Sequence, residues 1–574
     1  MQRPRRPSAA ALALDLWPAL LAVLLCWPLL TTGGHPLARD LVFAPRQPWT
    51  DASLGLGDTA PRAVPLDALV SLANLVVDGG VLAKVVVPLV LAVAGWGIHR
   101  SLRSLGTVAR LAAAGFAVWN PFVVERLALG QWALLAGYAA LPWIAMAATR
   151  WRREGRLIDL ASVGCWLALA SITPTGGLLG VATAVVFGAT RRGRTVPLVG
   201  VAGVLQLPWL LPALLGSSGL TSDPDGVAAF ASRAEGPGGV LVSVVGLGGI
   251  WDGLSVPASR ETWWATAAAV GVAAAVVLGF PRLARCWGRS VSLRAVGLAV
   301  AGLLLALLSS WGPGADLLRW VLETVPGGGL LRDSQKYAAG WAVLAASCVG
   351  AATDRLLVAT RRAGAEVGVP IVLAVVLAPF LLLPDATRAT WPTVTPVDWP
   401  VGLTSLEEGV LDQLDLDGPV ATLPWRSYRS FEWGTGLTSS DPALRLLDRP
   451  VVVDDRLVVG DVELSGESAL AADLGHALAT STPAEALRAT GIPLAVIYLD
   501  DPGVGTLDLT GLEPVAQSPE VALYRVPVET APERVGPARG VVLAGDLLAV
   551  LLLVLSAGYR VVGSPRFHGR GRIH

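Results

Sequence analysis

The chain is poor in the residues that build metal sites and disulfides. Its 574 residues include only four cysteines and five scattered histidines, without the spacing of metal ligands. Cys26, Cys165 and Cys348 fall in apolar segments, Cys286 falls in a basic link, and residues 385–540 contain no cysteine. These shortages argue against a zinc enzyme and against a disulfide-braced domain.

Charge is scarce as well. Only 15% of the residues are charged, 53% are hydrophobic, and the mean hydropathy of +0.59 is too high for a soluble enzyme of this length. A membrane-spanning helix needs roughly 20 apolar residues. Twelve segments meet this need, and we predict an α-helical multi-pass protein of the cell membrane. They are 12–31, 82–98, 107–122, 131–149, 157–172, 175–190, 195–215, 262–280, 294–311, 337–357, 367–384 and 541–560.

Positive charge is confined to alternate links between these segments. Seven links hold 24 arginines, whereas the other links, residues 385–540 apart, hold nine Arg or Lys. Because positive residues accumulate on the cytoplasmic side, we predict that both termini are cytoplasmic, which an even number of spans requires. The basic links are Arg3–Arg6, Arg100–Arg110, Arg150–Arg156, Arg191–Arg194, Arg282–Arg294, Arg355–Arg362 and Arg560–Arg572.

The first apolar segment follows basic residues, as in a signal peptide. It is too long, and it lacks a clear small-x-small cleavage site before Gly33, so we interpret it as an uncleaved anchor. The chain has no GxxxxGK[ST] motif and no cytoplasmic link long enough for a nucleotide-binding domain, which argues against ATP-driven transport. It also lacks the inverted repeat of many secondary transporters.

We divide the chain into three parts. Residues 1–384 form a membrane body with a long outer link at 32–80, residues 385–540 form an extracytoplasmic domain, and residues 541–574 form the last span and a basic tail. The extracytoplasmic domain has 24 Asp or Glu and 10 Arg, a net charge of −14. Neither charge pattern indicates nucleic-acid binding, because the basic residues are membrane anchors near anionic lipid.

The extracytoplasmic domain is predicted to be α/β, with helices on one side of the strands. The strands are 418–425, 449–459, 493–500 and 520–527, and the helices are 468–479 and 483–490. Aromatic residues near Arg426, Arg429 and Glu432 suit stacking on sugar rings, although core packing and contact with the membrane surface is the favoured interpretation. They are Trp391, Trp399, Trp425, Tyr428, Phe431 and Trp433.

The outer link 32–80 holds the first candidate site. His35, Arg39 and Asp40 follow the first apolar segment, and Asp51, Asp58 and Asp67 come later. An acid at the membrane boundary could take a proton from an acceptor hydroxyl. The alternative is an ordinary loop acid that caps a short helix. An amphipathic helix is predicted at 64–78, lying along the membrane. Its apolar side comprises Val64, Leu66, Leu69, Val70, Leu72 and Leu75.

The second candidate site is WNPFVVERLALGQWALLAGYAALPW, residues 119–143, a predicted tight hairpin between two spans. Glu125, Arg126 and Gln131 lie in it among three tryptophans that indicate the membrane interface. A Glu–Arg pair that faces a cavity would hold a polar substrate. Equally, the pair could fasten the hairpin to the first outer link.

The third candidate site is PGGGLLRDSQKYAAGW, residues 326–341. The chain has only two lysines, Lys84 and Lys336, and Arg332 would share a helical face with Lys336, four residues later. Two cations beside a glycine run suit a lipid phosphate or diphosphate. The alternative is simple anchoring at the membrane interface.

At these three places the chain resembles the GT-C class of membrane glycosyltransferases, in particular actinobacterial cell-wall arabinofuranosyltransferases. The likeness rests on Asp40 after the first helix, the lateral helix 64–78, the hairpin 119–143 and RDSQKY at 332–337. The extracytoplasmic α/β domain adds to it. The chain departs from the class where Arg39 stands in place of a second acid, and it lacks a large carbohydrate-binding extension.

The resemblance implies a GT-C fold, a polyprenyl-phosphate sugar donor and a cell-envelope glycan or glycolipid acceptor. It makes Asp40 the catalytic base of an inverting transfer, and Arg332 and Lys336 the ligands of the lipid phosphate. The substrate pocket is assigned to His35, Arg39, Glu125, Arg126 and Gln131. No cofactor is required, and a divalent metal is compatible with the chemistry but has no supporting ligand set.

Two other functions fit the sequence. A non-catalytic membrane scaffold or lipid-linked glycan transporter would use the acidic domain to bind a partner or polymer. Such a protein would tolerate Asp40→Ala but fail without residues 385–540, whereas a transferase would lose activity with Asp40→Ala. A polymer ligase that acts on a longer lipid-linked glycan is a weaker alternative.

Overall fold

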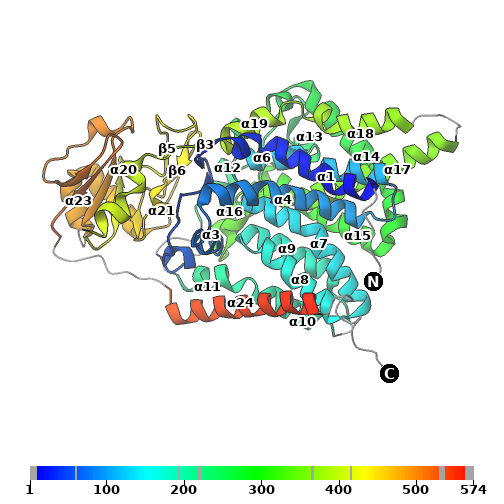
Figure 1. The fold of residues 1–574 in the computed structure, drawn as a ribbon, viewed down its shortest axis with the longest axis horizontal. Helices are drawn as coiled ribbons and strands as arrows, with labels where there is room; N and C mark the ends of the chain where they lie inside the picture. The colour runs from blue at the N-terminus through cyan, green and yellow to red at the C-terminus, as the bar shows by residue number, and fades with distance from the viewer. Residues whose placement is uncertain are drawn as a thin grey trace.

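The structure is a computed structural model that describes residues 9–57, 61–191, 193–216, 222–362, 368–413, 416–528 and 537–562. A helical body carries an α/β domain at one end (Figure 1). The predicted basic residues Arg3–Arg6, Arg192 and Arg566–Arg572, and the predicted loop acid Asp58, lie outside the described residues.

Seven helical segments in the described ranges are long and apolar enough to cross a membrane. They are α4 (Gly79–Ser101), α5 with α6 (Thr107–Val118, Pro121–Ala128), α7 (Trp132–Glu154), α14 (Trp263–Trp287), α15 (Arg289–Leu308), η5 with α17 (Ser334–Ala338, Ala339–Arg362) and α24 (Arg539–Val562). Two bent pairs raise the number to nine: α10 (Thr195–Val204) with α11 (Leu207–Leu215), and α18 (Gly368–Leu382) with α19 (Ala386–Val394).

Three shorter apolar helices occupy the remaining predicted segments. They are α1 (Ala9–Leu25), α8 (Leu157–Ala170) and α9 (Pro174–Gly188). All twelve predicted segments are therefore helical over the described residues, and a multi-pass membrane protein is supported. The count of twelve spans is not confirmed, because helix length and composition qualify seven segments, or nine with the bent pairs.

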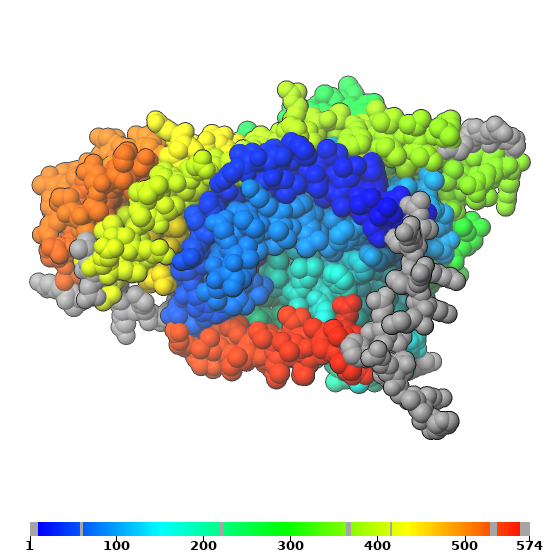
Figure 2. All heavy atoms as spheres, viewed as in Figure 1, coloured from blue at the N-terminus to red at the C-terminus, as the bar shows by residue number. Residues whose placement is uncertain are grey.

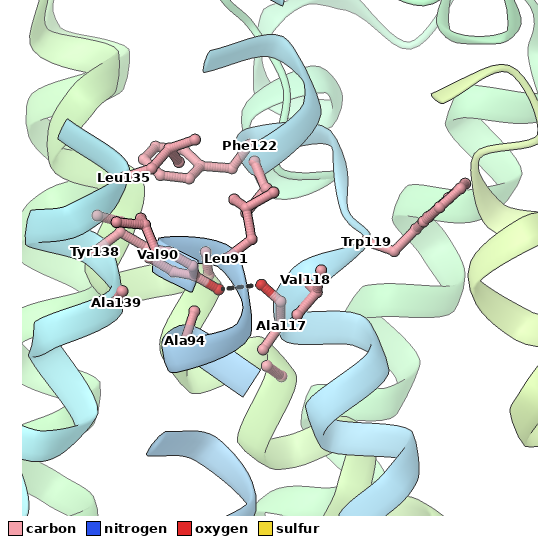
Figure 3. Close-up of a cluster of buried hydrophobic side chains, with 14 of the residues drawn as sticks. Val90, Leu91, Ala94, Ala117, Val118, Trp119, Phe122, Leu135, Tyr138 and Ala139 are labelled. Carbon is pink, nitrogen blue, oxygen red and sulfur yellow. Dashed lines mark hydrogen bonds between the residues drawn. The ribbon is translucent and has the colours of Figure 1, made fainter. Parts of the chain in front are cut away.

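Small and aromatic side chains close the centre of the body. Figure 3 shows residues of α4, α5, α6 and α7 packed together, with the Tyr138 hydroxyl donating to the Ala117 carbonyl at 3.0 Å. Alanines at α5 and α7 let the helix backbones approach, as is usual in membrane bundles. This core fixes the α6–α7 turn, which carries the second candidate site.

The outer helices α14, α15, α18 and α24 leave large apolar side chains exposed. In a membrane protein such faces are covered by lipid. Helix α24 lies along one edge of the body (Figures 1 and 2). It packs on α8 and α11, and the Ser556 hydroxyl lies where a Cβ on Gly164 of α8 would meet it at 2.8 Å.

The lateral helix predicted at 64–78 is present as α3 (Leu66–Asn74). Its predicted single apolar side is wrong. Val64 and Val70 are buried against the protein, whereas Leu69, Leu72 and Leu75 are exposed. The physical reason is that Ala68, Ser71 and Asn74 define the buried side at helical spacing, which leaves the leucines on the opposite side.

Short strands join the outer link to the chain after α19. Strand β1 (His35–Ala38) pairs with β2 (Leu41–Val42) and with β3 (Pro396–Val397), giving the order β2-β1-β3. Helix α19 packs against α1 and α6 in the body. The domain boundary placed at residue 385 stays a prediction.

The C-terminal domain is built around a five-stranded sheet, ordered β11-β12-β10-β4-β7. The predicted helices and three of the predicted strands are present, but the single strand predicted at 449–459 is wrong: only 451–452 joins this sheet, and 457–459 pairs in a separate hairpin. Strand β11 was not predicted. The strands are β4 (Val420–Leu423), β7 (Val451–Val452), β10 (Leu494–Tyr498), β11 (Glu513–Gln517) and β12 (Val521–Arg525). Helices α22 (Ala469–Thr480) and α23 (Pro483–Thr490) cover one face. The expectation that only one side is covered is wrong, since Leu403, Leu411 and Leu446 pack on the other. Successive strand side chains point to opposite faces, and both faces here are apolar.

Two small hairpins complete the domain. They are β5 (Tyr428–Arg429) with β6 (Ser439–Ser440), and β8 (Leu457–Val459) with β9 (Val462–Leu464). The shorter helical elements are α2 (Trp27–Thr31), η1 (Ala52–Leu54), α12 (Gly226–Ala229), α13 (Gly239–Val245), η2 (Gly253–Ser255), η3 (Ala258–Glu261), α16 (Gly312–Thr324), η4 (Gly328–Leu331), α20 (Val401–Thr404), η6 (Glu407–Leu411), α21 (Ala443–Leu446) and η7 (Val504–Thr506).

Candidate functional site

Asp40 lies at the turn between β1 and β2 and contacts both the body and the C-terminal domain. Its Oδ2 accepts a hydrogen bond of 3.2 Å from Nε2 of Gln131, and its Oδ1 accepts one of 3.0 Å from the Tyr428 hydroxyl. The charge of Asp40 and burial raise the pKa of Tyr428 above its usual range, so the hydroxyl keeps its proton. Both parts of the molecule therefore orient one half-buried carboxylate.

The backbone of this turn packs on the α6–α7 turn. The Asp40 N–H donates to the Leu129 carbonyl at 3.4 Å. Gly130 has a φ of +83°, and a Cβ there would overlap the Leu41 nitrogen and lie 3.0 Å from Asp40 backbone atoms. Glycine permits both this conformation and this approach. The α6–α7 turn thus fixes where Asp40 stands.

Arg39 is also held by both parts of the molecule. Its φ is +54°, a left-handed conformation that is unusual for arginine. Its N–H donates to the Thr438 carbonyl at 2.7 Å, and its carbonyl accepts from the Ser440 N–H at 3.0 Å. Its Nη1 donates to Oδ2 of Asp252 at 2.6 Å. Arg39 therefore anchors the turn through its backbone, and its guanidinium is paired with Asp252.

Arg126 links the first and third candidate sites. It is fully buried, and its Nη1 and Nη2 donate to the Asp333 carboxylate at 2.7 and 3.0 Å. Its Nη1 also donates to Oε1 of Gln131 at 2.9 Å. Since Gln131 donates in turn to Asp40, hydrogen bonds join Asp40 to Asp333 without a break. A buried arginine needs such bidentate pairing.

Lys336 extends this network from the buried Asp333 to a half-buried position. Its Nζ lies 3.3 Å from Oδ2 of Asp333. Burial opposes the ionised form of Asp333, but the charges of Arg126 and Lys336 hold its pKa well below the usual range. Lys336 is half-buried, and contacts through Asp333, Arg126 and Gln131 join it to Asp40. A cation therefore stands near the candidate base.

Arg332 occupies a neighbouring position. Its guanidinium lies 4.8 Å from the centre of the Phe230 ring. Burial and the charge of Arg62 lower the pKa of Arg332 to about 10, so it stays charged at neutral pH. It lines a cavity of about 450 Å³ between the body and the C-terminal domain. The other lining residues are Ser222, Asp223, Pro224, Glu323, Leu464, Ser465, Gly466 and Glu467.

The expectation that Arg332 and Lys336 share one helical face is wrong. Element η4 ends at Leu331 and η5 begins at Ser334, so a break in the helical backbone separates the two cations. The break turns Asp333 inward to Arg126. Both cations nevertheless interact electrostatically across this short segment.

Besides Arg39, whose side chain bonds Asp252, two predicted pocket residues lie outside the bonded network. Glu125 does not pair with Arg126, because adjacent helical residues point in different directions. Its buried carboxylate lies 3.9 Å from Nε of Arg260, which pairs with Glu235. His35 instead bonds Oδ2 of Asp78 through Nε2 at 2.9 Å.

Sequence reasoning missed the partners that organise the site. Asp333 and Gln335 lie inside RDSQKY, and Gln335 accepts from Nε of Arg126 at 3.1 Å. Asp333 lies between Arg332 and Lys336 in the sequence, and an acid flanked by two cations indicates an ion-pair network. Tyr428 was considered only as a packing or sugar-stacking residue. Tyr428 and Asp40 are 388 residues apart in the sequence, and no local pattern predicts their contact.

The described residues contain no group of three or more His, Cys, Asp or Glu arranged to hold a metal ion. The site is instead a set of single acids and cations joined by amides and a phenol. Asp40, Gln131, Arg332 and Lys336 are half-buried, whereas Arg126 and Asp333 are buried behind them. This arrangement can accept a proton beside positive charge.

No model of a known protein family matches the chain, and no curated protein matches it in sequence. Solved structures do. The arabinofuranosyltransferase AftD from Mycobacteria covers 90% of this chain with a TM-score of 0.56 and 16% identity, and its mutant R1389S, class 2, gives 0.52. ArnT from Cupriavidus metallidurans, bound to undecaprenyl phosphate, covers 92% at 14% identity, but its TM-score of 0.43 supports no argument.

The GT-C-like fold expected from the sequence is therefore confirmed, because AftD has the same architecture over most of this chain. At 16% identity the likeness concerns the fold alone. The chain spans 40% of the length of the AftD chain it matches.

Proposed function

We propose that this protein is a membrane glycosyltransferase that moves a sugar from a polyprenyl-phosphate donor to a cell-envelope glycan or glycolipid. One observation carries the proposal: Asp40, held by Gln131 and Tyr428, is joined to the half-buried Lys336 through Gln131, Arg126 and the Asp333 carboxylate. A base and a cation are the two groups that transfer from a lipid phosphate requires. The AftD-like fold supports the same class of reaction.

In the proposed reaction Asp40 takes the proton of an acceptor hydroxyl. The acceptor oxygen forms a bond to the anomeric carbon as the bond from that carbon to the phosphate oxygen breaks. The polyprenyl phosphate leaves with the electron pair, and the single displacement inverts the anomeric centre. No nucleotide sugar takes part, since the donor arrives through the bilayer.

Lys336 and Arg332 stabilise the charge that develops on the leaving phosphate. Such preorganised charge is usually the largest contribution to catalysis. Asp333 holds Lys336 in place, and Arg126 prevents Asp333 from neutralising it fully, because the carboxylate is shared between the two cations. The ammonium therefore keeps attraction for an incoming phosphate.

The proposed orientation places both termini in the cytoplasm and the C-terminal domain outside. The alternation of arginine-rich links supports it. We propose arabinofuranose as the transferred sugar, on the strength of the AftD-like fold.

The test is linkage analysis of cell-envelope glycans in a deletion strain. The strain is complemented at matched protein level with the wild type, Asp40→Ala or Asp51→Ala. Asp51 lies in the same link but makes an exposed ion pair with Arg539, so its loss should cost little.

A linkage that disappears in the deletion and returns with the wild type and Asp51→Ala, but not with Asp40→Ala, supports the transferase. Restoration by Asp40→Ala would remove Asp40 as the base and favour the scaffold or transporter.

A further inference from the structure

The β5–β6 hairpin of the C-terminal domain contacts Asp40 from two directions. The Tyr428 hydroxyl of β5 donates to the Asp40 carboxylate at 3.0 Å. The backbone beside β6 bonds both polar backbone groups of Arg39, through the Thr438 carbonyl and the Ser440 N–H. The side chain of Asp40 and the residue before it are thus set by the same hairpin.

The hairpin is itself anchored rigidly. Arg429, next to Tyr428, is fully buried and donates to Asp441 at 2.6 Å and to Asp501 at 3.2 Å. Its Nη2 donates to Thr422 and to the Pro424 carbonyl, both at 2.9 Å. With these donors occupied, the backbone that carries Tyr428 has one position relative to the sheet.

Further contacts hold the domain against the body around this point. Arg445 Nε lies 3.2 Å from the Asp67 carboxylate of α3, and the Ser465 N–H donates to Asp223 at 2.9 Å. Arg62 pairs with Glu467. These contacts surround the hairpin, so its approach to Asp40 belongs to a built interface.

We propose that the β5–β6 hairpin is a positioning element of the active site, through which the C-terminal domain orients the Asp40 carboxylate by the Tyr428 hydroxyl. This inference rests on the proposed transferase function. Tyr428 occupies one lone pair of Oδ1 and Gln131 one of Oδ2, which leaves acceptor capacity on both oxygens for the proton of the incoming hydroxyl. The C-terminal domain is then a component of the catalytic site.

Tyr428→Phe removes the hydroxyl and keeps the ring. We expect kcat to fall about tenfold or more, the effect of losing one hydrogen bond to a charged group, with KM for donor and acceptor unchanged. The assay uses full-length protein in membranes, a synthetic polyprenyl-phosphate arabinofuranose and a short arabinofuranosyl acceptor.

Ser427→Ala is the matched control. Its hydroxyl donates to the Arg456 carbonyl at 2.8 Å, in the same hairpin but away from Asp40. It should leave kcat within about twofold of the wild type, as surface substitutions usually do. Adding Tyr428→Phe to Asp40→Ala should cause no further loss, since the hydroxyl acts through the missing carboxylate.

The outcomes separate this inference from the proposed function. If Asp40→Ala is inactive while Tyr428→Phe matches the wild type in kcat, the hairpin is not a positioning element and the transferase stands. If Asp40→Ala stays active, or the wild type transfers nothing, the proposed function falls and the inference falls with it. An equal loss in Ser427→Ala would show a general effect of the hairpin and would also overturn the inference.

Discussion

Two fully buried arginines, Arg126 in the body and Arg429 in the C-terminal domain, solve the same electrostatic problem differently. Arg429 is enclosed by Asp441 and Asp501 and lies 4.5 Å from the centre of the Tyr498 ring. Its partners face the domain core. Arg126 shares Asp333 with a second cation, Lys336, which is half-buried.

The Arg429 cluster holds a segment of the C-terminal domain in place, whereas the Arg126 cluster acts on Asp40 through hydrogen bonds. The Arg429 cluster reaches the surface through Arg426, which pairs with Asp501 at 3.3 Å, and its effect on Asp40 passes through the backbone to Tyr428. The Arg126 cluster is open at Lys336 and Gln131, and it delivers charge and a hydrogen bond to the place where Asp40 lies. Buried polar networks that end at accessible groups are the ones that chemistry can use.

The largest expected effect comes from removing each arginine in turn. Arg429→Met leaves the buried Asp441 without a cation and Asp501 with only the half-exposed Arg426, and should lower stability by about 3–5 kcal/mol. Arg126→Met should cost less, roughly 2–3 kcal/mol, because Lys336 still faces Asp333. Hydrogen exchange in detergent should show lost protection of β4 and β10 for Arg429→Met, and of α6 for Arg126→Met.

Acid titration sharpens this comparison. The pKa of Asp333 is depressed, so its contribution to stability is present above its unfolded value of about 3.9 and is lost as pH falls toward the folded value. Stability of the wild type should therefore fall more steeply below about pH 4 than that of Arg126→Met. If the stability of the wild type and of Arg126→Met fell in parallel with pH, Arg126 would not be what stabilises the ionised form of Asp333.

A smaller effect is expected on kcat when each of the two lysines is replaced in turn. Lys336→Gln should lower kcat about 100-fold, the loss typical of one preorganised electrostatic contact, with little change in protein abundance. Lys84→Gln, at the only other lysine, is the control and should behave as wild type. Equal activity of the two variants would remove Lys336 from the phosphate site.

The smallest expected effect compares two glycines of positive φ. Gly130→Ala places a Cβ against Leu41 and Asp40, whereas Gly460→Ala in the C-terminal domain, at a φ of +61°, meets nothing within 4 Å. Gly460→Ala should lose about 1–2 kcal/mol of stability through backbone strain alone, and Gly130→Ala should lose more because its Cβ also overlaps backbone atoms. Only Gly130→Ala should also lose transfer activity, measured by the same linkage analysis. Loss of activity in both would indicate strain without a specific effect on Asp40.

Much of the fold was predictable because its signals are local. Apolar segments of bilayer length predicted helices at all twelve positions, and short continuous apolar runs such as PLAVIYLD, at β10, predicted the sheet. The packing of α19 against the body, and the cover on both faces of the sheet, depend on contacts between distant segments. These were beyond the reach of local patterns.

The sequence alone determined a multi-pass membrane body, an α/β domain and an acid, an amide and two cations worth considering together. Tertiary structure decided which of them meet. It paired Arg126 with Asp333 instead of Glu125, turned His35 to Asp78, and brought Tyr428 to Asp40. The reason is that a buried charge takes the partner whose geometry satisfies it, and packing between distant elements sets that geometry.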